Sequence, residues 1–155
     1  MTASAPSAPT ATLGLIAPTF DLDSSAGRVR LQQLRGRPTV VFFLREFNCM
    51  VCLQHVSALK RLSAAYPDVQ FLVVGGGSVA QARQLAERFK LEFPVVADPE
   101  RVAYARYDLG KALGLLQRSG TAVIDASGTL RLFLGSFNPM ASFLEREVTR
   151  ALGNI

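Results

Sequence analysis

The sequence predicts an α/β fold in which helices flank a central mixed sheet. Short apolar runs rich in β-branched residues alternate with stretches of helical period, and this alternation is typical of parallel strand-helix-strand units. Two further apolar runs near the C-terminus are separated only by Ala126-Ser127-Gly128, a turn short enough to force an antiparallel hairpin. The chain has 155 residues, 49% of them hydrophobic, which suffices for one core without disulfide bonds.

Residues 1–12 are predicted to form a flexible tail. After Met1 they contain only Ala, Ser, Thr and Pro, so they cannot bury enough apolar surface to offset the entropy of ordering. Residues 13–155 then form a single domain. The sequence has neither the charged and apolar leader of a secreted protein nor an apolar run of about 20 residues that would span a bilayer. We therefore expect a cytoplasmic protein without a membrane partner.

Basic residues outnumber acidic ones, which gives a net charge of +5 and a pI of about 9.8. They are scattered along the chain, and no basic run, helix-turn-helix pattern or zinc finger accompanies them. Scattered charge is weak evidence for a polyanion partner. We therefore expect no nucleic-acid partner.

A strand and a helix are predicted over residues 38–66. Residues 38–44, PTVVFFL, form a continuous apolar run with β-branched and aromatic side chains, which is typical of a strand covered on both faces. From about Asn48 a helical period takes over, and it lasts until Pro67, which cannot continue a helix. The apolar positions of this helix are Cys52, Val56, Leu59, Leu62 and Tyr66.

A second strand-helix unit is predicted next. Residues 69–74, VQFLVV, form another buried strand, and Ser78 and Gln81 then have the spacing of a capping box, which satisfies free amides at a helix start. A third short strand is expected over residues 93–97, and Asp98-Pro99 suits the cap and first position of another helix. The buried stripe of the capped helix is Val79, Ala82, Leu85, Ala86 and Phe89.

The hairpin comprises residues 121–125 and 129–134, and a closing helix is expected to begin at Asn138-Pro139. Strand alternation places Leu130, Leu132 and Leu134 on one face of the hairpin. The apolar side of the closing helix comprises Met140, Phe143, Leu144, Val148 and Ala151. The resulting order, β-α-β-α-β-α-β-β-α, is that of a thioredoxin-like sheet with additions.

The only two cysteines, Cys49 and Cys52, lie where the first strand gives way to its helix, an edge of the sheet where α/β proteins place their sites. A free thiol has a pKa of about 8.5, and lowering this pKa by about 1.5 requires about 2 kcal/mol. A partly buried helix N-terminus can supply that free energy. Across one helical turn, one sulfur can also resolve a sulfenate formed on the other. The pair therefore predicts an internal dithiol-disulfide cycle.

Other interpretations of these residues stay open at this point. Both cysteines could be small buried hydrophobes, or they could hold zinc together with His55, although a closed zinc site requires four ligands. His55 could instead pack beside the site or act as a general base. The glycines at 75–77 precede a helix but lack the Lys-Ser/Thr ending of a phosphate loop, which favours a tight turn. We expect no cofactor and no metal.

Three segments resemble the peroxiredoxin-like family (alkyl hydroperoxide reductase and thiol-specific antioxidant) of the thioredoxin superfamily. They are APTFDLDSSAGRVRLQQLRGRPTVVFFLREFNCMVC, VADPERVAYARYDLG and TAVIDASGTLR, and the similarity extends over residues 14–152. LREFNCMVC is similar to the branch that carries two cysteines at this site. The resemblance implies a thioredoxin fold, reduction of hydroperoxides through a cysteine sulfenate, and a thioredoxin-like reductant.

The resemblance also implies roles for single residues. The family motif Pro-x-x-x-Thr-x-x-Cys places its cysteine at Cys52, its Thr at Cys49 and its Pro at Arg45, so both supporting residues are missing. In this register Cys52 attacks peroxide and Cys49 resolves the sulfenate, whereas the thioredoxin mechanism makes Cys49 the nucleophile. The buried arginine of the family best matches Arg118, which lies one residue further upstream.

Three residues are candidates for substrate contact: Arg45, Phe47 and Thr121. The guanidinium of Arg45 could favour a thiolate if it turns inward. Phe47 and neighbouring phenylalanines could line an apolar pocket for organic hydroperoxides, or they could pack in the core. Gly120-Thr121 resembles the family's version of the position where thioredoxins carry a cis-proline.

Three hypotheses on function follow. The first is a thiol peroxidase that forms a Cys49–Cys52 disulfide. The second is a thiol-disulfide oxidoreductase of thioredoxin type, which the intact pair and the missing Thr and Pro favour. The third is a non-catalytic redox sensor. A homodimer could form through exposed sheet edges or a helix face.

Overall fold

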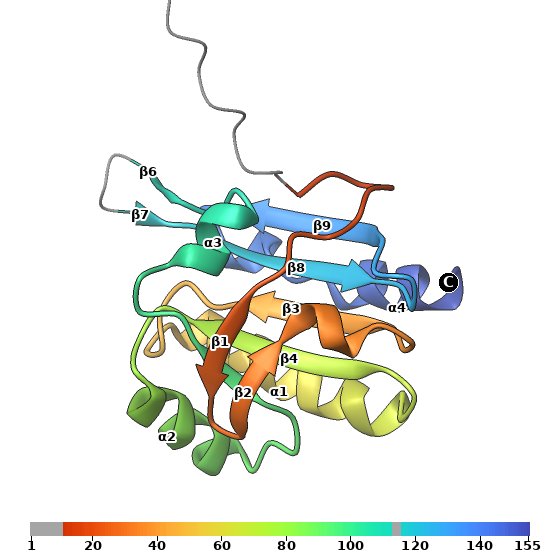
Figure 1. Cartoon of the computed structure of the whole chain (residues 1–155). Coiled ribbons are helices and arrows are strands. Elements are labelled where there is room, and N and C mark those ends of the chain that lie inside the picture. The colour runs from red at the N-terminus through yellow and green to blue at the C-terminus, as the bar shows by residue number, and fades with distance from the viewer. Residues whose placement is uncertain (1–10, 113–115) are drawn as a thin grey trace, which may run out of the picture.

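The computed structural model describes residues 11–112 and 116–155, so residues 1–10 of the predicted tail lie outside the described residues. Figure 1 shows the arrangement of the elements. Within the described ranges, no helix combines the length and the apolarity that crossing a membrane requires. The elements are β1 (Asp21–Ser24), β2 (Gly27–Arg30), η1 (Leu31–Leu34), β3 (Thr39–Phe43), α1 (Met50–Ala65), β4 (Gln70–Gly75), α2 (Val79–Phe89), β5 (Val95–Ala97), α3 (Val102–Arg106), β6 (Lys111–Ala112), β7 (Leu116–Gln117), β8 (Ser119–Ile124), β9 (Leu130–Ser136), η2 (Pro139–Ala141) and α4 (Glu145–Gly153).

A seven-stranded mixed sheet runs through the molecule in the order β2-β1-β5-β4-β3-β8-β9, and β6 and β7 pair separately. Strands β3, β4 and β5 are parallel, whereas β8 is antiparallel to β3 and forms a hairpin with β9. The predicted mixed sheet with flanking helices and a closing hairpin is confirmed.

The central strands are covered on both faces, as their continuous apolar runs predicted. Val40 and Phe42 belong to a cluster that includes side chains of α1, α2 and α4. Val41 and Phe43 belong to a second cluster with side chains of α3 and β2. All four are fully buried, so successive side chains of β3 stabilise opposite layers.

The predicted end of α1 and the predicted start of α2 are also confirmed. Helix α1 ends at Ala65, just before Pro67. Helix α2 begins with the predicted capping box, in which Ser78 Oγ accepts from the Gln81 amide and the Gln81 side chain accepts from the Ser78 amide. Lys90 closes α2 in the left-handed region, with φ at 52°.

The hairpin of β1 and β2 was not predicted, because each of its short strands carries a single apolar residue, Leu22 or Val29. Both side chains pack on the second cluster, and polar contacts add to this: Arg28 Nε lies 2.5 Å from Asp21 Oδ1, and Arg28 Nη1 lies 3.1 Å from Asp23 Oδ1. Gly27 closes the turn at φ of 99°, a conformation that favours glycine. The hairpin joins the main sheet through Ser24, which pairs with Val96 of β5.

The prediction that Leu130, Leu132 and Leu134 share one face is wrong, because a β-bulge interrupts β9. Val123 pairs with Leu132, but Ile124 pairs with Leu130, so Arg131 is an extra residue on its strand. Leu130 therefore lies in the cluster with α3, whereas Leu132 packs on the cluster with α1. Arg131 points its Nε to the Asp125 carboxylate at 2.7 Å.

The single closing helix predicted from Asn138-Pro139 is also wrong. A short 3₁₀ turn, η2, is followed by an extended Leu144 before α4 begins. Thr121 Oγ1 donates to the carbonyl of Ser142 at 2.6 Å. In a continuous helix this carbonyl would instead accept from the amide four residues later. Met140 and Leu144 of the predicted apolar side are exposed.

The helix predicted to begin at Pro99 begins instead at Val102, after Arg101 in the left-handed region. Asp98 still acts as its cap from a distance: its carboxylate accepts from the amides of Val102 and Ala103 at 2.9 and 2.8 Å, and from Tyr104 at 3.3 Å. Asp98 is fully buried. The carboxylate thus satisfies amides that α3 itself leaves without partners.

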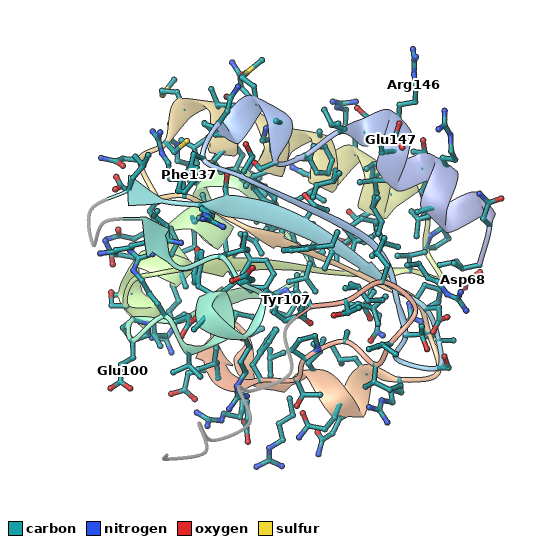
Figure 2. The ribbon with its side chains drawn as sticks, turned by 90° about the horizontal axis from the view of Figure 1, so that it is seen from above. Asp68, Glu100, Tyr107, Phe137, Arg146 and Glu147 are labelled. Carbon is teal, nitrogen blue, oxygen red and sulfur yellow. The ribbon has the colours of Figure 1, made fainter. Side chains whose placement is uncertain are left out.

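Substitution Asp98→Ala should lower the free energy of unfolding by about 2 kcal/mol, because it leaves buried amides of α3 unpaired. Urea denaturation of the two proteins measures this loss. Asp68→Ala is the matched control, since the Asp68 side chain is exposed at the periphery (Figure 2) and its removal should change stability by less than about 0.5 kcal/mol. Equal losses in both variants would contradict this role of Asp98.

Candidate active site at the start of α1

The two cysteines lie in a segment whose path is fixed where β3 and β4 end. The Leu44 amide bonds the Val74 carbonyl at 2.9 Å. The hydroxyl of Tyr104 lies within hydrogen-bond distance of both the Leu44 carbonyl, at 2.5 Å, and the Val74 carbonyl, at 3.0 Å. Tyr104 is completely buried, and its burial raises its pKa. A neutral phenol therefore holds the ends of two neighbouring parallel strands together.

Cys49 is the N-cap of α1, and both sulfurs lie against main-chain amides. Cys49 Sγ accepts from the Cys52 amide at 3.3 Å, and Cys52 Sγ accepts from the Arg45 amide at 3.4 Å. Both thiols are free. Cys49 is 4% exposed and Cys52 0%. An amide that points at a sulfur favours its thiolate, so this arrangement can stabilise negative charge on either sulfur.

The surroundings of Cys52 oppose ionisation of its thiol. Burial raises the pKa of Cys52 to about 12, and the neighbouring Cys49 thiol adds to this rise, whereas the Arg45 amide acts in the other direction. At neutral pH Cys52 therefore keeps its proton. The contribution predicted for Arg45 was that of its guanidinium, and this stays a prediction. The contact that the structure describes comes from the main-chain amide of Arg45.

The ring of Phe47 packs against the end of β4 and the loop that follows it. This close contact is the reason that residues 75 and 77 are glycines. A Cβ built on Gly75 would lie 2.2 Å from the Phe47 ring, and one on Gly77 would lie 2.9 Å from it. At Gly76 the Arg101 guanidinium fills the equivalent space. The predicted tight turn is thus also a site of close packing. A hollow of about 330 Å³ lies beside it, lined by Glu46, Phe47, Asn48, Gly76, Gln81 and Arg101.

Thr121 lies on β8, paired with Phe42 of β3. It is fully buried, and its hydroxyl donates to the Ser142 carbonyl. This bond ties β8 to the segment between η2 and α4. The contact of Thr121 with a substrate stays a prediction.

Arg118 precedes β8 and stacks on an aromatic ring. Its guanidinium carbon lies 4.3 Å from the centroid of Phe137, and Figure 2 shows Phe137 at the end of the sheet opposite Asp68. Arg118 Nε and Ser119 Oγ are buried, and neither has a hydrogen-bond partner in the part of the chain that the structure describes. The predicted catalytic role of Arg118 stays a prediction.

His55 packs beside the site. Its Nε2 lies 2.8 Å from the Pro139 carbonyl, so the proton belongs on Nε2 when the ring is neutral. The ring contacts Phe42 edge-on and lies tilted against Phe143. Burial lowers the pKa of His55, although the bond to Pro139 opposes this. The histidine therefore joins α1 to η2 as a neutral ring.

Within residues 11–112 and 116–155, no three His, Cys, Asp or Glu side chains are grouped so that they could hold a metal ion. One residue that shapes the site was absent from the sequence interpretation. Tyr104 reaches it from α3, far along the chain, and its neighbours in sequence give no signal of that contact.

The family model described as AhpC/TSA family matches residues 13–133. Mouse (Mus musculus) "Peroxiredoxin-like 2C" is 33% identical over 55% of this chain and 39% of its own length. Rice (Oryza sativa subsp. japonica) "Peroxiredoxin Q, chloroplastic" is 26% identical over 81% of this chain and 60% of its own. The chain thus spans less than two thirds of the length of the curated relatives it matches.

A solved structure, that of "Peroxidoxin BcpB from Mycobacterium tuberculosis", superposes with a TM-score of 0.80 at 20% sequence identity, and covers 92% of this chain and 97% of its own. At that identity the likeness establishes a shared fold. The predicted thioredoxin-like fold with peroxiredoxin-type additions is therefore confirmed.

The two thiols should differ in reactivity when each is left alone. In Cys49→Ser, the buried Cys52 should react with iodoacetamide at least about tenfold more slowly at neutral pH than Cys49 does in Cys52→Ser, because alkylation requires the thiolate. Mass spectrometry of timed samples measures both rates. Equal rates would mean that burial does not hold Cys52 protonated.

The neutral His55 should make stability depend on pH. Since its pKa is lowered in the folded state, its contribution is present above the unfolded pKa of about 6.5 and is lost as pH falls below that value. The wild type should therefore lose more stability between about pH 7 and pH 5 than His55→Gln, which cannot titrate. Urea midpoints at both pH values test this, and identical losses would refute it.

Proposed function

Because this chain belongs to the AhpC/TSA family, we propose that it is a thiol peroxidase that reduces hydroperoxides through Cys49 and Cys52. The observation that carries the proposal is the pair of free thiols at the first turn of α1, with each sulfur against a main-chain amide. One sulfur caps the helix and the other lies one turn further along. Attack on an oxidant and resolution by the neighbour are thus available in a single turn.

In the first step, we propose, a cysteine thiolate attacks one oxygen of the hydroperoxide. The O–O bond breaks, the leaving alkoxide or hydroxide takes up a proton, and the sulfur becomes a sulfenic acid. The second cysteine then attacks this sulfur, the S–O bond breaks, and water leaves as the Cys49–Cys52 disulfide forms. An external dithiol, such as a thioredoxin-like protein, restores both thiols by exchange and is itself oxidised to a disulfide.

Cys49 is the better candidate for the attacking sulfur, although the family register assigns that role to Cys52. Cys49 caps the helix and retains some exposure, whereas Cys52 is fully buried. Burial also raises the pKa of Cys52 to about 12. An oxidant and a reductant arriving from solvent both meet Cys49 first. The adjacent Met50, 70% exposed, offers an apolar contact to such a partner.

Four further residues, Arg45, Phe47, Thr121 and Arg118, are proposed to contribute to the site. The main-chain amide of Arg45 donates to Cys52 Sγ. Phe47 and Asn48, which precede Cys49 in the chain, line the hollow. Thr121 and Arg118 lie at β8, which borders β3 on the side away from β4. Contact of these four with the hydroperoxide is part of the proposal. A reducing compartment such as the cytoplasm would keep the dithiol ready for the cycle, and a homodimer remains an expectation.

A thiol-disulfide oxidoreductase acting on proteins is the second candidate. It is favoured by the cap position of Cys49, which retains 4% exposure, and by the complete burial of Cys52, since the thioredoxin mechanism uses the more accessible N-terminal sulfur as the nucleophile. The family's Pro and Thr are replaced here by Arg45 and Cys49, and this replacement also favours the oxidoreductase. A redox sensor would use the same disulfide without turnover.

The wild type should consume a hydroperoxide continuously when a thioredoxin-type dithiol system is supplied. Cys49→Ser should lose at least about 100-fold in rate, since the attacking sulfur is gone. Cys52→Ser should form one sulfenate per chain, on Cys49, and then stop. Consumption of NADPH by the coupled reductant, together with dimedone trapping, measures these outcomes.

The double variant Cys49→Ser/Cys52→Ser is the baseline for these assays. Equal peroxide consumption by it and by the wild type would overturn the peroxidase proposal. Reduction of insulin disulfides faster than peroxide turnover would replace it with the second candidate. Sulfenate confined to Cys52 in the single variants would keep the cycle and exchange the roles of the two sulfurs.

A further inference from the structure

Ser119, the first residue of β8, carries a buried hydroxyl that the proposed cycle does not yet use. The residue is 0% exposed, and its Oγ has no hydrogen-bond partner among the described residues. Two residues along the same strand, Thr121 is equally buried, but its hydroxyl is bonded to the Ser142 carbonyl. Burying a hydroxyl without a partner opposes folding, and an alanine at this position would avoid the penalty.

The hydroxyl of Ser119 lies on the face of the sheet that α1 covers. Side chains alternate along a strand, so Ser119 shares its face with Thr121, which pairs with Phe42. Phe42 and both cysteines belong to the same hydrophobic cluster. Ser119 therefore points to the layer that contains the two sulfurs.

Ser119 also lies at the level of Cys52 along the sheet. Thr121 pairs with Phe42, and the Phe42 ring contacts His55 of α1. Two strand residues advance about 6.6 Å from Thr121 to Ser119. Three helical residues advance about 4.5 Å in the same direction from His55 to Cys52. The last registered pair of these two strands is Phe43 with Gly120, so one step further Ser119 lies opposite Leu44. Leu44 immediately precedes Arg45, whose amide bonds Cys52 Sγ.

We propose that the Ser119 hydroxyl donates a hydrogen bond to the sulfur of Cys52 when this sulfur becomes the thiolate that closes the disulfide. The inference rests on the proposed peroxidase cycle with Cys49 as the attacking sulfur. In the closing step the Cys52 thiol loses its proton, its sulfur attacks Cys49, and the S–O bond breaks. The departing hydroxide takes up a proton and leaves as water. Ser119 stabilises the negative charge before the new bond forms.

The chemistry of the site explains why such a donor is needed. Cys52 has the Arg45 amide as a partner, but burial still raises its pKa to about 12. The titratable side chains that act on it are the Cys49 thiol on the same helix and the Tyr104 phenol from α3. Neither carries a positive charge. His55, one turn further along α1, faces the Pro139 carbonyl instead.

The test compares Ser119→Ala with the wild type in two measurements. In the Cys49→Ser background, the rate at which iodoacetamide alkylates Cys52 at a fixed pH of about 8 reports its thiolate fraction and hence its pKa. Ser119→Ala should lower this rate about tenfold, as a rise of about one in that pKa requires. In the full dithiol protein, rapid mixing with a hydroperoxide should show the sulfenate forming at an unchanged rate. The disulfide should then close roughly tenfold more slowly, as expected when a hydrogen bond to a charged group is lost.

Ser24→Ala is the matched control, because Ser24 is also a buried serine but bonds the Gly27 carbonyl and the Ala26 amide at the far edge of the sheet. It should lose stability and keep both the pKa and the rate of closure. Ser119→Ala should keep or gain stability in urea denaturation. Ser119→Thr, which retains a hydroxyl, should restore the lower pKa of Cys52.

An unchanged pKa of Cys52 and an unchanged rate of closure in Ser119→Ala would overturn the inference. The pKa measurement needs no turnover, so it separates this inference from the proposed function. A raised pKa in a protein that reduces no hydroperoxide would retain the bond from Ser119 to Cys52 and remove the peroxidase cycle. Slower sulfenate formation with normal closure would also overturn the inference, because the hydroxyl would then act on the first sulfur.

Discussion

The junction at which β3 and β4 end determines the geometry of the site. The Tyr104 hydroxyl lies against the carbonyls of Leu44 and Val74, so the last residues of two parallel strands are fixed by one side chain from the opposite layer. Because the chain leaves β3 at a fixed point, the next amide, that of Arg45, meets Cys52 Sγ. The helix that follows then starts with Cys49 as its cap. Loss of the Tyr104 contact would free the segment on which both sulfurs depend.

A second constraint acts from the loop after β4. Phe47, Arg101 and Gln81 occupy the positions where side chains of residues 75–77 would otherwise lie. The glycines therefore allow the segment that leads to Cys49 to pack directly on the neighbouring loop. Arg101 also stacks on Tyr104, with its guanidinium carbon 5.3 Å from the ring centroid. Both loops and α3 are thus joined around the start of α1, and this packing limits how far the first cysteine can move.

Much of this arrangement could be predicted, and the failures have identifiable causes. Apolar runs and the capping box at Ser78 located the central strands and α2, because these signals are local in sequence. The spacing of Cys49 and Cys52 likewise predicted that both sulfurs lie at the start of α1, because this signal is also local. The bulge at Arg131 and the break at Ser142 were missed, since each depends on a partner from another element: Asp125 and Thr121. The role of Tyr104 was missed because only the tertiary fold brings α3 against the segment that leads to the cysteines.

The two outer strands of the sheet have a bearing on self-association. A flat strand with free main-chain groups invites another chain to pair with it. On β2, Arg28 and Arg30 place charge along that border, and on β9 the extra residue Arg131 bends the strand out of register. The charges on β2 and the bulge at the start of β9 therefore disfavour continuous pairing of these margins with a second sheet. Two copies of the chain would pair more readily through a helical or loop surface than through these strands.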